Sequence, residues 1–305
     1  MARVPPAADV TRLIGNTPLV RLSRLVPEGL DVEVYAKLEG FNPGGSVKDR
    51  AALWMVDDAE RRGLLDGRRI LDATSGNTGI ALAMIGAARD HAVTLCVPEN
   101  ASPGRTRAMR AFGAKLVLTN PLEGTDGAQR VAKRMADRRS KDFAYLDQYN
   151  NPANWSAHYE TTGPEILRQL PGRITHFVAG LGTTGTLVGT SRRLREAHPG
   201  LRVVAVQPDG PMHGIEGLKH LESALVPGIW APAAADEHMF VSTEAAQRTA
   251  KRVAREEGLL AGTSSGAALA ACLELAMRLR RGRIVTIFPD GAERYFTERY
   301  WEEGP

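Results

Sequence analysis

Residues 178–190 read VAGLGTTGTLVGT, an apolar run followed by glycines and threonines and then by a helical pattern. A strand that leads through such a turn into a helix is the building unit of a parallel α/β sheet. Two further stretches carry glycine- and hydroxyl-rich turns before helices, DATSGNTGIALAM at 72–84 and LAGTSSGAALAAC at 260–272. This recurrence predicts an α/β fold, with turns at the carboxyl ends of strands, where open α/β sheets bind ligands.

Strand and helix patterns alternate along most of the chain. The expected strands are 32–37, 69–73, 92–98, 114–119, 174–180, 202–208 and 283–289. Further helical patterns cover 49–63, 105–113, 127–140 and 243–258. The strands are too many for one sheet and lack eightfold regularity, so we expect two doubly wound units rather than a barrel. The polar stretch 148–155 marks the change of unit, and the non-periodic residues 209–235 are interpreted as a long functional loop.

The composition indicates a soluble protein of ordinary globular type. The chain has 305 residues, 43% of them hydrophobic and 24% charged, and its 39 basic and 35 acidic residues are spread along its length. That distribution argues against nucleic acid as a partner. Cys96 and Cys272 lie in apolar stretches and cannot build a disulfide framework or a metal site. No signal-peptide segment or membrane-spanning run is present, so an intracellular, cytoplasmic protein without metal or membrane contact is expected.

The turn TSGNTG at 74–79 has the features of an anion site. Free backbone N–H groups and the positive dipole end at the start of the following helix attract an anion. Thr74, Ser75, Asn77 and Thr78 add side-chain donors, and a carboxylate or a phosphate fits. The alternative for this turn alone is an ordinary helix cap.

The turn GLGTTGT at 180–186 favours a phosphate. Its glycines let the backbone approach a ligand closely, and Thr183, Thr184 and Thr186 can donate to phosphate oxygens. It is neither a P-loop nor a good dinucleotide fingerprint, which leaves a mononucleotide-sized phosphate without metal. In the third turn, Ser264 and Ser265 precede a helix of small residues, and simple capping is the alternative there.

Lys48 in FNPGGSVKDR (41–50) is a candidate nucleophile. Only seven of the 39 basic residues are lysines, and this one stands at an expected helix start, where the positive dipole end disfavours the ammonium form. An uncharged amine can form an imine with a carbonyl. The alternative is an exposed surface lysine. An imine-forming lysine, a metal-free phosphate turn and a carboxylate turn are together what pyridoxal 5'-phosphate with an amino-acid substrate requires.

The chain resembles the fold-type II pyridoxal-phosphate enzymes, and within them the cysteine synthase (O-acetylserine sulfhydrylase) and cystathionine β-synthase family. The motifs that carry the resemblance are LIGNTPLVRL (13–22), KLEGFNPGGSVKDR (37–50), TSGNTG (74–79), QYNNPAN (148–154), GLGTTGT (180–186), GTSSGAA (262–268) and DGAERY (290–295). The resemblance implies two three-layer α/β domains with the cofactor in the cleft between them. It further implies a smaller, mobile domain at 41–152 with the substrate-carboxylate loop, a larger one at 1–40 plus 153–305 with the phosphate site, and a homodimer.

The resemblance assigns roles residue by residue. Lys48 looks like the Schiff-base lysine and the base for the α-proton, and Asn77 like the partner of the pyridoxal 3′-oxygen. The phosphate would be bound by Gly182, Thr183, Thr184, Gly185 and Thr186. The substrate carboxylate would be bound by Thr74, Ser75, Thr78 and Gln148. Ser264 matches the hydroxyl that faces the pyridine nitrogen; being neutral, it leaves the ring a weaker electron sink than an aspartate would, which suits elimination of a good leaving group.

The implied reaction is a β-replacement that makes L-cysteine from O-acetylserine, or O-phosphoserine, and sulfide or another sulfur donor. The short segment at 209–230 resembles the B-type cysteine synthases. Lys219 falls where some B-type relatives carry an arginine for O-phosphoserine, although it lacks the bidentate fork. Cystathionine β-synthase activity with homocysteine is the alternative. A serine or threonine dehydratase and a catalytically silent binding relative are further alternatives.

Overall fold

The computed structural model describes residues 6–302, which form two compact units. The first unit contains the described residues up to Asn16 and Asn42–Gln148, and the second contains Thr17–Phe41 and the described residues from Tyr149 onward. Residues 6–16 therefore belong to the first unit, whereas the sequence analysis placed them with the larger one. Residues 1–5 and 303–305, also assigned there to the larger unit, lie outside the described residues.

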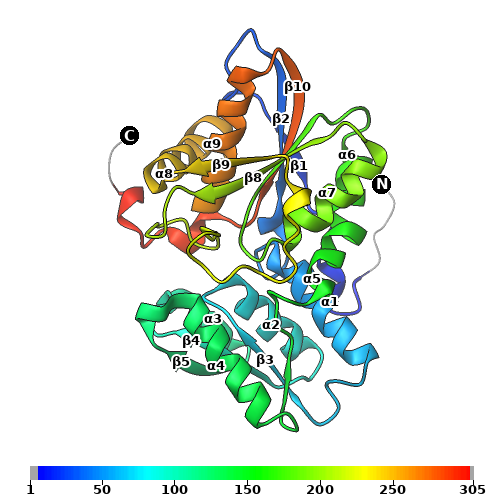
Figure 1. The fold of residues 1–305 in the computed structure, drawn as a ribbon, viewed down its shortest axis with the longest axis vertical. Helices are drawn as coiled ribbons and strands as arrows, with labels where there is room; N and C mark the ends of the chain where they lie inside the picture. The colour runs from blue at the N-terminus through cyan, green and yellow to red at the C-terminus, as the bar shows by residue number, and fades with distance from the viewer. Residues whose placement is uncertain (1–5, 303–305) are drawn as a thin grey trace. The chain divides into compact units, whose positions relative to one another are not determined.

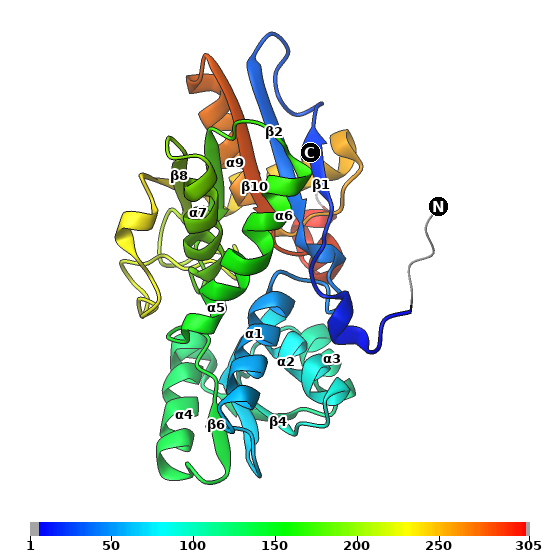
Figure 2. The ribbon, with the colours of Figure 1, turned by 90° about the vertical axis from the view of Figure 1, so that its right-hand side faces the viewer.

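The first unit is built on a parallel sheet in the order β5-β4-β3-β6. Its strands are β3 (Arg69–Ala73), β4 (Val93–Pro98), β5 (Lys115–Thr119) and β6 (Phe143–Tyr145). Its helices are α1 (Lys48–Arg61), α2 (Asn77–Ala88), α3 (Pro103–Ala111) and α4 (Gly124–Arg138), with short turns η1 (Val10–Leu13) and η3 (Pro121–Glu123). Figure 2 shows α4 on one face of this sheet and α1, α2 and α3 toward the other.

The second unit is built on a larger sheet in the order β1-β2-β10-β7-β8-β9, in which only the β1–β2 pair is antiparallel. Its strands are β1 (Leu19–Leu22), β2 (Asp31–Leu38), β7 (His176–Gly180), β8 (Arg202–Pro208), β9 (Glu237–Val241) and β10 (Arg281–Phe288). Its helices are α5 (Pro152–Ala157), α6 (Gly163–Gln169), α7 (Gly185–Ala197), α8 (Thr243–Arg252) and α9 (Thr263–Arg278). Figure 1 shows α8 and α9 on one face and α6 and α7 on the other.

Short helical turns complete the second unit. They are the 3₁₀ turns η2 (Glu39–Phe41), η5 (Pro232–Ala234), η7 (Ala292–Tyr295) and η8 (Arg299–Trp301), and the π-helical turns η4 (His158–Thr162) and η6 (Val253–Glu257). Both units thus have a sheet between layers of helices, which confirms the predicted α/β class and the prediction of two doubly wound units. No helix within residues 6–302 combines the length and the apolar character that crossing a membrane requires.

The strand order places a switch point in each unit. In the first unit the chain runs outward from β3 through β4 to β5 and then returns to add β6 on the other side of β3. In the second unit β7 lies between β8 and the last strand, β10. Loops that leave neighbouring parallel strands in opposite directions open a crevice at their carboxyl ends, and ligands bind there. The turn at 74–79 follows β3, and the turn at 180–186 follows β7.

Burial explains why the sequence predicts parallel sheets. Every residue of β4, VTLCVP, is buried, as expected for a strand covered on both faces. Nine consecutive residues of α2 from Thr78 to Gly86 are also buried, so this helix is covered all round. Burial raises the pKa of the Cys96 and Cys272 thiols to about 12, so both cysteines are core residues rather than nucleophiles.

All seven predicted strands are present, and three were missed. β1 is four residues long, β6 is three residues long, and the edge strand β9 leaves Phe240 half exposed. Short or edge strands give no sustained apolar run to recognise. The helix predicted at 243–258 ends as α8 at Arg252 and continues as the π-helical turn η6. The prediction that 209–235 is mainly loop is confirmed, with η5 as the only helical turn among these described residues.

One buried ion pair joins β2 to α6 near the point where the chain enters the second unit. The Lys37 ammonium, fully buried, lies 2.7 Å from a Glu165 carboxylate oxygen and donates to the Thr17 carbonyl oxygen over 2.7 Å. The Thr17 hydroxyl in turn donates to Glu39 over 2.7 Å. A buried charge persists only when it is paired and hydrogen-bonded, and this network meets that condition.

Candidate active site

The turn at 182–186 requires glycine because neighbouring segments press against it. A Cβ at Gly182 would lie 2.3 Å from the Gly217 carbonyl oxygen, and one at Gly185 would lie 2.1 Å from the Asn154 side-chain oxygen. Neither distance is compatible with a side chain. The segment after β8 is joined to the same turn, because the Lys219 N–H donates to the Leu181 carbonyl over 2.7 Å.

Thr184 leaves the start of α7 ready to receive an anion. It adopts the left-handed conformation, with φ of 72°, and its side chain makes no capping hydrogen bond. Its hydroxyl is buried and has no hydrogen-bond partner among the described residues. A buried hydroxyl without a partner costs free energy, and here it lies at the positive end of a helix dipole. A phosphate oxygen is the acceptor that both features favour.

The other two threonines of this turn are already oriented by neighbours. Thr183 accepts a hydrogen bond from the Asn154 side-chain amide at 3.0 Å. The Thr186 hydroxyl lies 3.2 Å from Nε2 of His158, a buried residue in η4. Asn154 belongs to the QYNNPAN motif but was given no role from sequence, and His158 was not identified at all.

The turn at 74–79 uses one of its predicted donors to build itself. The Thr74 hydroxyl accepts from the backbone N–H groups of Gly76 at 3.0 Å and Gly79 at 3.2 Å. The hydroxyl therefore shapes the start of α2, while its own proton remains available for another acceptor. Ser75 and Asn77 are half-buried at the same turn.

Gln148 joins this turn from the other side of the switch point. The Thr78 hydroxyl donates to the Gln148 side-chain oxygen over 2.7 Å, and the Gln148 amide donates to the Ala73 carbonyl over 2.6 Å. Thr78 and Gln148 are both buried. The structure thus brings together Thr74, Thr78 and Gln148, which the sequence analysis had grouped in one site.

Lys48 is the first residue of α1, and the loop before it is held by short-range hydrogen bonds. The Lys48 N–H donates to the Ser46 hydroxyl over 3.2 Å, and the Gly44 N–H donates to the Asp49 carboxylate over 2.5 Å. The Asn42 amide closes the loop by donating to the Ser46 carbonyl over 3.1 Å. The expectation that Lys48 stands at a helix start is confirmed.

A carboxylate of the chain itself lies close to the start of α9. A Cβ at Gly262 would lie 2.1 Å from an Asp290 carboxylate oxygen, and the Tyr295 hydroxyl donates to the other oxygen over 2.7 Å. Ser264 is buried in the first turn of this helix. Because Asp290 already faces this helix end, the site of Ser264 suits a neutral polar group better than an anion. Asp290 belongs to the DGAERY motif, but its position near this helix could not be predicted from the sequence.

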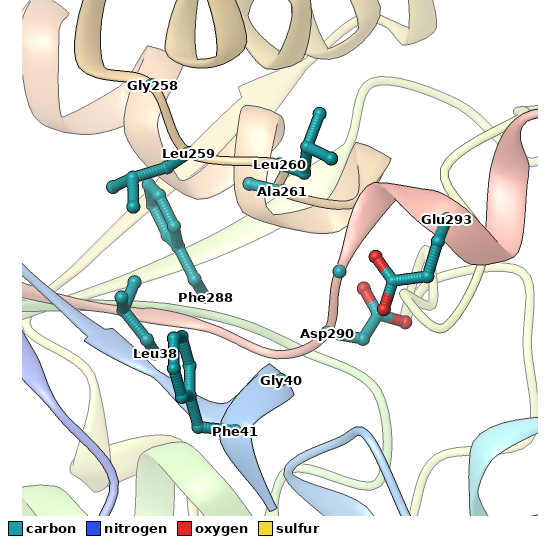
Figure 3. Close-up of a pocket in the computed structure, with 11 residues that line it drawn as sticks. Leu38, Gly40, Phe41, Gly258, Leu259, Leu260, Ala261, Phe288, Asp290 and Glu293 are labelled. Carbon is teal, nitrogen blue, oxygen red and sulfur yellow. The ribbon is translucent and has the colours of Figure 1, made fainter.

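A cavity of about 370 Å³ opens next to this carboxylate, in the second unit. Figure 3 shows Leu38, Phe41 and Phe288 on one side of it and the carboxylates of Asp290 and Glu293 on the other. None of the site residues predicted from sequence lines this cavity. It is therefore a different feature from the two turns at the switch points.

Lys219 lies beside Leu181, the residue that precedes the turn at 182–186. It is half-buried, its backbone is bound to Leu181, and its ammonium lies 5.1 Å from the centre of the Tyr149 ring. A cation over an aromatic face is attracted by the ring quadrupole. Lys219, in the long segment after β8, is thus fixed between Leu181 and Tyr149 in the second unit.

Comparison with known proteins gives the family. The family model described as "Pyridoxal-phosphate dependent enzyme" matches residues 10–290. The chain belongs to this family of pyridoxal-phosphate dependent enzymes. It is 54% identical to a cysteine synthase of Aquifex aeolicus over 94% of this chain and 90% of the relative. It is 45% identical to cysteine synthase B of Salmonella typhimurium over 95% of this chain and 97% of the relative. The crystal structure of O-ureido-L-serine synthase matches with a TM-score of 0.91 and 40% identity, over 99% of this chain and 98% of that one.

Features of this pyridoxal-phosphate enzyme fit the cofactor of its family. The phosphate would lie at the start of α7, where glycines leave room and the Thr184 hydroxyl lacks a partner. The neutral hydroxyl of Ser264 suits an uncharged pyridine nitrogen. No group of three or more His, Cys, Asp or Glu side chains within residues 6–302 is arranged to hold a metal ion.

Asp72, at the end of β3, is a buried carboxyl that the sequence analysis missed. Its pKa is raised to about 8, mainly by burial and to a smaller extent by the Asp147 carboxylate, against the lowering effect of hydrogen bonds from the Ala73 and Gln148 backbone. One Asp72 oxygen accepts from the Ala73 N–H over 2.7 Å. Asp72 is therefore mostly protonated in the folded enzyme at neutral pH, and it lies in β3 two residues before the turn at 74–79.

We expect Asp72→Asn to change the pH dependence of stability. Because the folded pKa is raised above the unfolded value, the stabilisation from Asp72 is complete below about pH 4 and is lost as pH rises toward about 8. The variant lacks this loss. Its free energy of unfolding in urea, relative to wild type, should rise from pH 5 to pH 8 by up to about 1.4 kcal/mol per pH unit. Parallel curves would contradict this, and Asp66→Asn, at an exposed aspartate, is the control.

Proposed function

We propose that this enzyme is a cysteine synthase of the B type. It would replace the β-substituent of O-acetylserine, or of O-phosphoserine, with sulfur from sulfide or another donor. The observation that carries the proposal is the buried hydrogen bond between Thr78 and Gln148 at the switch point, which lies where a substrate carboxylate is expected. The chain is also similar to cysteine synthases over most of its length. A chain of this family needs such a carboxylate site to bind an amino acid.

We propose the following roles for the chain's own groups. Lys48 would bind the cofactor aldehyde and take the proton from the substrate α-carbon. The backbone N–H groups and hydroxyls of the turn at 182–186 would hold the phosphate, and Asn77 would donate to the 3′-oxygen. Ser264 would face the pyridine nitrogen. The bound cofactor would supply an electron sink for the α-carbon.

The substrate carboxylate would be held by the turn at 74–79. The proton of the Thr74 hydroxyl, the Ser75 hydroxyl and the backbone N–H groups at the start of α2 can all donate to it. Thr78 and Gln148 already pair with each other, so they would fix the shape of the turn and the position of the carboxylate. Accurate placement of the α-carbon near the base is what raises the rate.

The identity of the second substrate is the open choice within this proposal. A solved relative at 40% identity is named for O-ureido-L-serine. In that compound the atom bonded to the β-carbon is an oxygen, whereas in cysteine it is sulfur. Acceptors therefore differ among close relatives, and homocysteine, which would make this a cystathionine β-synthase, is the second candidate. We further propose a cytoplasmic homodimer; the two free, buried cysteines suit a reducing compartment.

A donor-by-acceptor panel on the purified protein tests the proposed function. We expect cysteine to form from sulfide and O-acetylserine, O-phosphoserine or both, because the carboxylate turn and Lys48 serve any β-activated serine. Lys48→Ala should lower the rate at least about a hundredfold by removing the proton acceptor, while Lys115→Ala, at an exposed lysine of the same unit, should not change it.

Other outcomes of the panel would overturn the proposal in distinct ways. Cystathionine from serine and homocysteine, without cysteine from either donor, would assign the alternative activity. Release of pyruvate without any acceptor would indicate a dehydratase. No turnover with any pair would indicate a silent relative.

Lys219→Met tests the choice of donor. Methionine keeps the alkyl stem beside Tyr149 but removes the ammonium. If Lys219 binds the phosphate of O-phosphoserine, the KM for O-phosphoserine should rise about tenfold, the loss of one charge-assisted hydrogen bond, and the KM for O-acetylserine should stay within about twofold. Lys219→Arg should keep the use of O-phosphoserine. Equal changes of KM for both donors would show that Lys219 acts through packing alone.

A further inference from the structure

A buried histidine lies directly behind the phosphate turn. His158 begins the π-helical turn η4, between α5 and α6, and only 1% of its surface is exposed. Its Nδ1 lies 2.9 Å from the hydroxyl of Thr162, and its Nε2 lies 3.2 Å from the hydroxyl of Thr186. The ring thus joins a fully buried threonine to a half-buried threonine of the phosphate turn. Single π-helical turns are frequent at functional sites.

The packing of α7 fixes the ring in this place. A Cβ at Gly189 would lie 2.0 Å from the Trp155 carbonyl oxygen and 2.9 Å from Cβ of His158. The glycine therefore lets α7 lie against α5 and η4 at backbone distance. With both ring nitrogens engaged by hydroxyls and the helix pressed against its Cβ, the imidazole has one orientation.

With a neutral imidazole between them, the two hydroxyls can be oriented in two ways. In one, the Thr186 hydroxyl donates a hydrogen bond to Nε2 and turns its oxygen lone pairs toward the ligand side. In the other, Thr162 donates to Nδ1, the Nε2–H donates to the Thr186 oxygen, and the Thr186 proton is left for an external acceptor. A phosphate dianion accepts hydrogen bonds and donates none, so it favours the second direction, and each bond in such a chain strengthens the next.

We propose that His158 is a positioning residue that fixes the direction of the Thr186 hydroxyl, so that Thr186 donates its proton to the cofactor phosphate. The inference rests on the proposed cofactor site and deepens it. Thr162 sets the tautomer by donating to Nδ1, and His158 transmits that choice to Thr186 through Nε2–H. No proton moves in this arrangement; the residues only orient it.

The test measures cofactor affinity of the protein freed of pyridoxal phosphate, together with the ³¹P chemical shift of the bound phosphate. His158→Asn places its amide near the Nδ1 position and cannot reach Thr186, whereas His158→Gln places an amide N–H near the Nε2 position. We expect the Kd for pyridoxal phosphate to rise about tenfold in His158→Asn and to stay within about threefold in His158→Gln. The unfolding midpoints of both variants show whether a weaker affinity for pyridoxal phosphate results only from a general loss of stability.

A double-mutant cycle with Thr186→Val isolates the pair. The Thr186 variant alone should weaken binding about tenfold, and adding His158→Asn to it should change the Kd by less than about twofold, because the hydroxyl that His158 orients is gone. Thr190→Val is the matched control: it removes a buried hydroxyl without a partner on the same helix and should leave the Kd unchanged. Thr162→Val, which leaves the imidazole intact, should raise the Kd about threefold if His158→Asn does not fold.

Equal losses in the Gln and Asn variants, full additivity in the cycle, or an unchanged Kd in His158→Asn or Thr162→Val would each overturn the inference. These results differ from failure of the proposed function. If wild-type protein does not bind pyridoxal phosphate, the cofactor site itself is wrong. If wild type binds it and the variants bind equally well, the site stands and only the role of His158 is wrong.

Discussion

The close backbone contacts at the start of α7 are the constraint on which the rest of the site depends. Gly182 lies against the Gly217 carbonyl, and Gly185 lies against the Asn154 side chain, so no side chain can fill the turn. The left-handed Thr184 then places a buried hydroxyl, which has no partner within residues 6–302, at the positive end of the helix. Such a hydroxyl costs about 1–3 kcal/mol when it stays unsatisfied. An anion of phosphate size would offset that cost and the helix dipole at once, which is the physical basis for proposing this turn as the phosphate site.

Three turns that look alike in the sequence differ in which side chains lie at the start of the helix that follows them. The start of α2 is capped by Thr74, within its own turn. The start of α9 faces Asp290, which lies 26 residues after Ser264 in the chain and comes from the loop beyond β10. At the start of α7 the Thr184 side chain caps nothing. The glycines and threonines of the turn at 182–186 favour a phosphate already in the sequence, and the structure adds the long-range packing against Gly217 and Asn154 that the sequence could not reveal.

The fold was predictable where the signal is local and sustained. Fully buried strands such as β4 are continuous apolar runs, and a glycine-rich turn before a helix marks the carboxyl end of a strand. The resemblance to a known enzyme family, and not these local patterns, grouped Thr78 with Gln148, and it could not show that the two side chains pair directly. β6 was missed because three residues carry no periodicity, yet its position beside β3 is what brings Gln148 to the turn at 74–79.

Residues that act from behind the site were beyond sequence reasoning. Asp72 reads as one polar residue in a strand, and only its complete burial reveals a carboxyl that is protonated at neutral pH. His158 has no motif of its own, and its meaning comes from the contact with Thr186, 28 residues away. Both residues lie one layer behind predicted ligand-binding turns, where side chains orient other side chains and leave no pattern in spacing.

The central claim is that the turn at 182–186 binds this cofactor by its phosphate. The most direct measurement compares the affinity of the cofactor-free protein for pyridoxal phosphate and for pyridoxal, in wild type and in Gly185→Ala. The account predicts that wild type binds pyridoxal at least about a hundredfold more weakly, a difference of about 2.7 kcal/mol, and that Gly185→Ala loses most of this preference. Equal affinity for the two compounds in wild type, or an undiminished preference in Gly185→Ala, would contradict it.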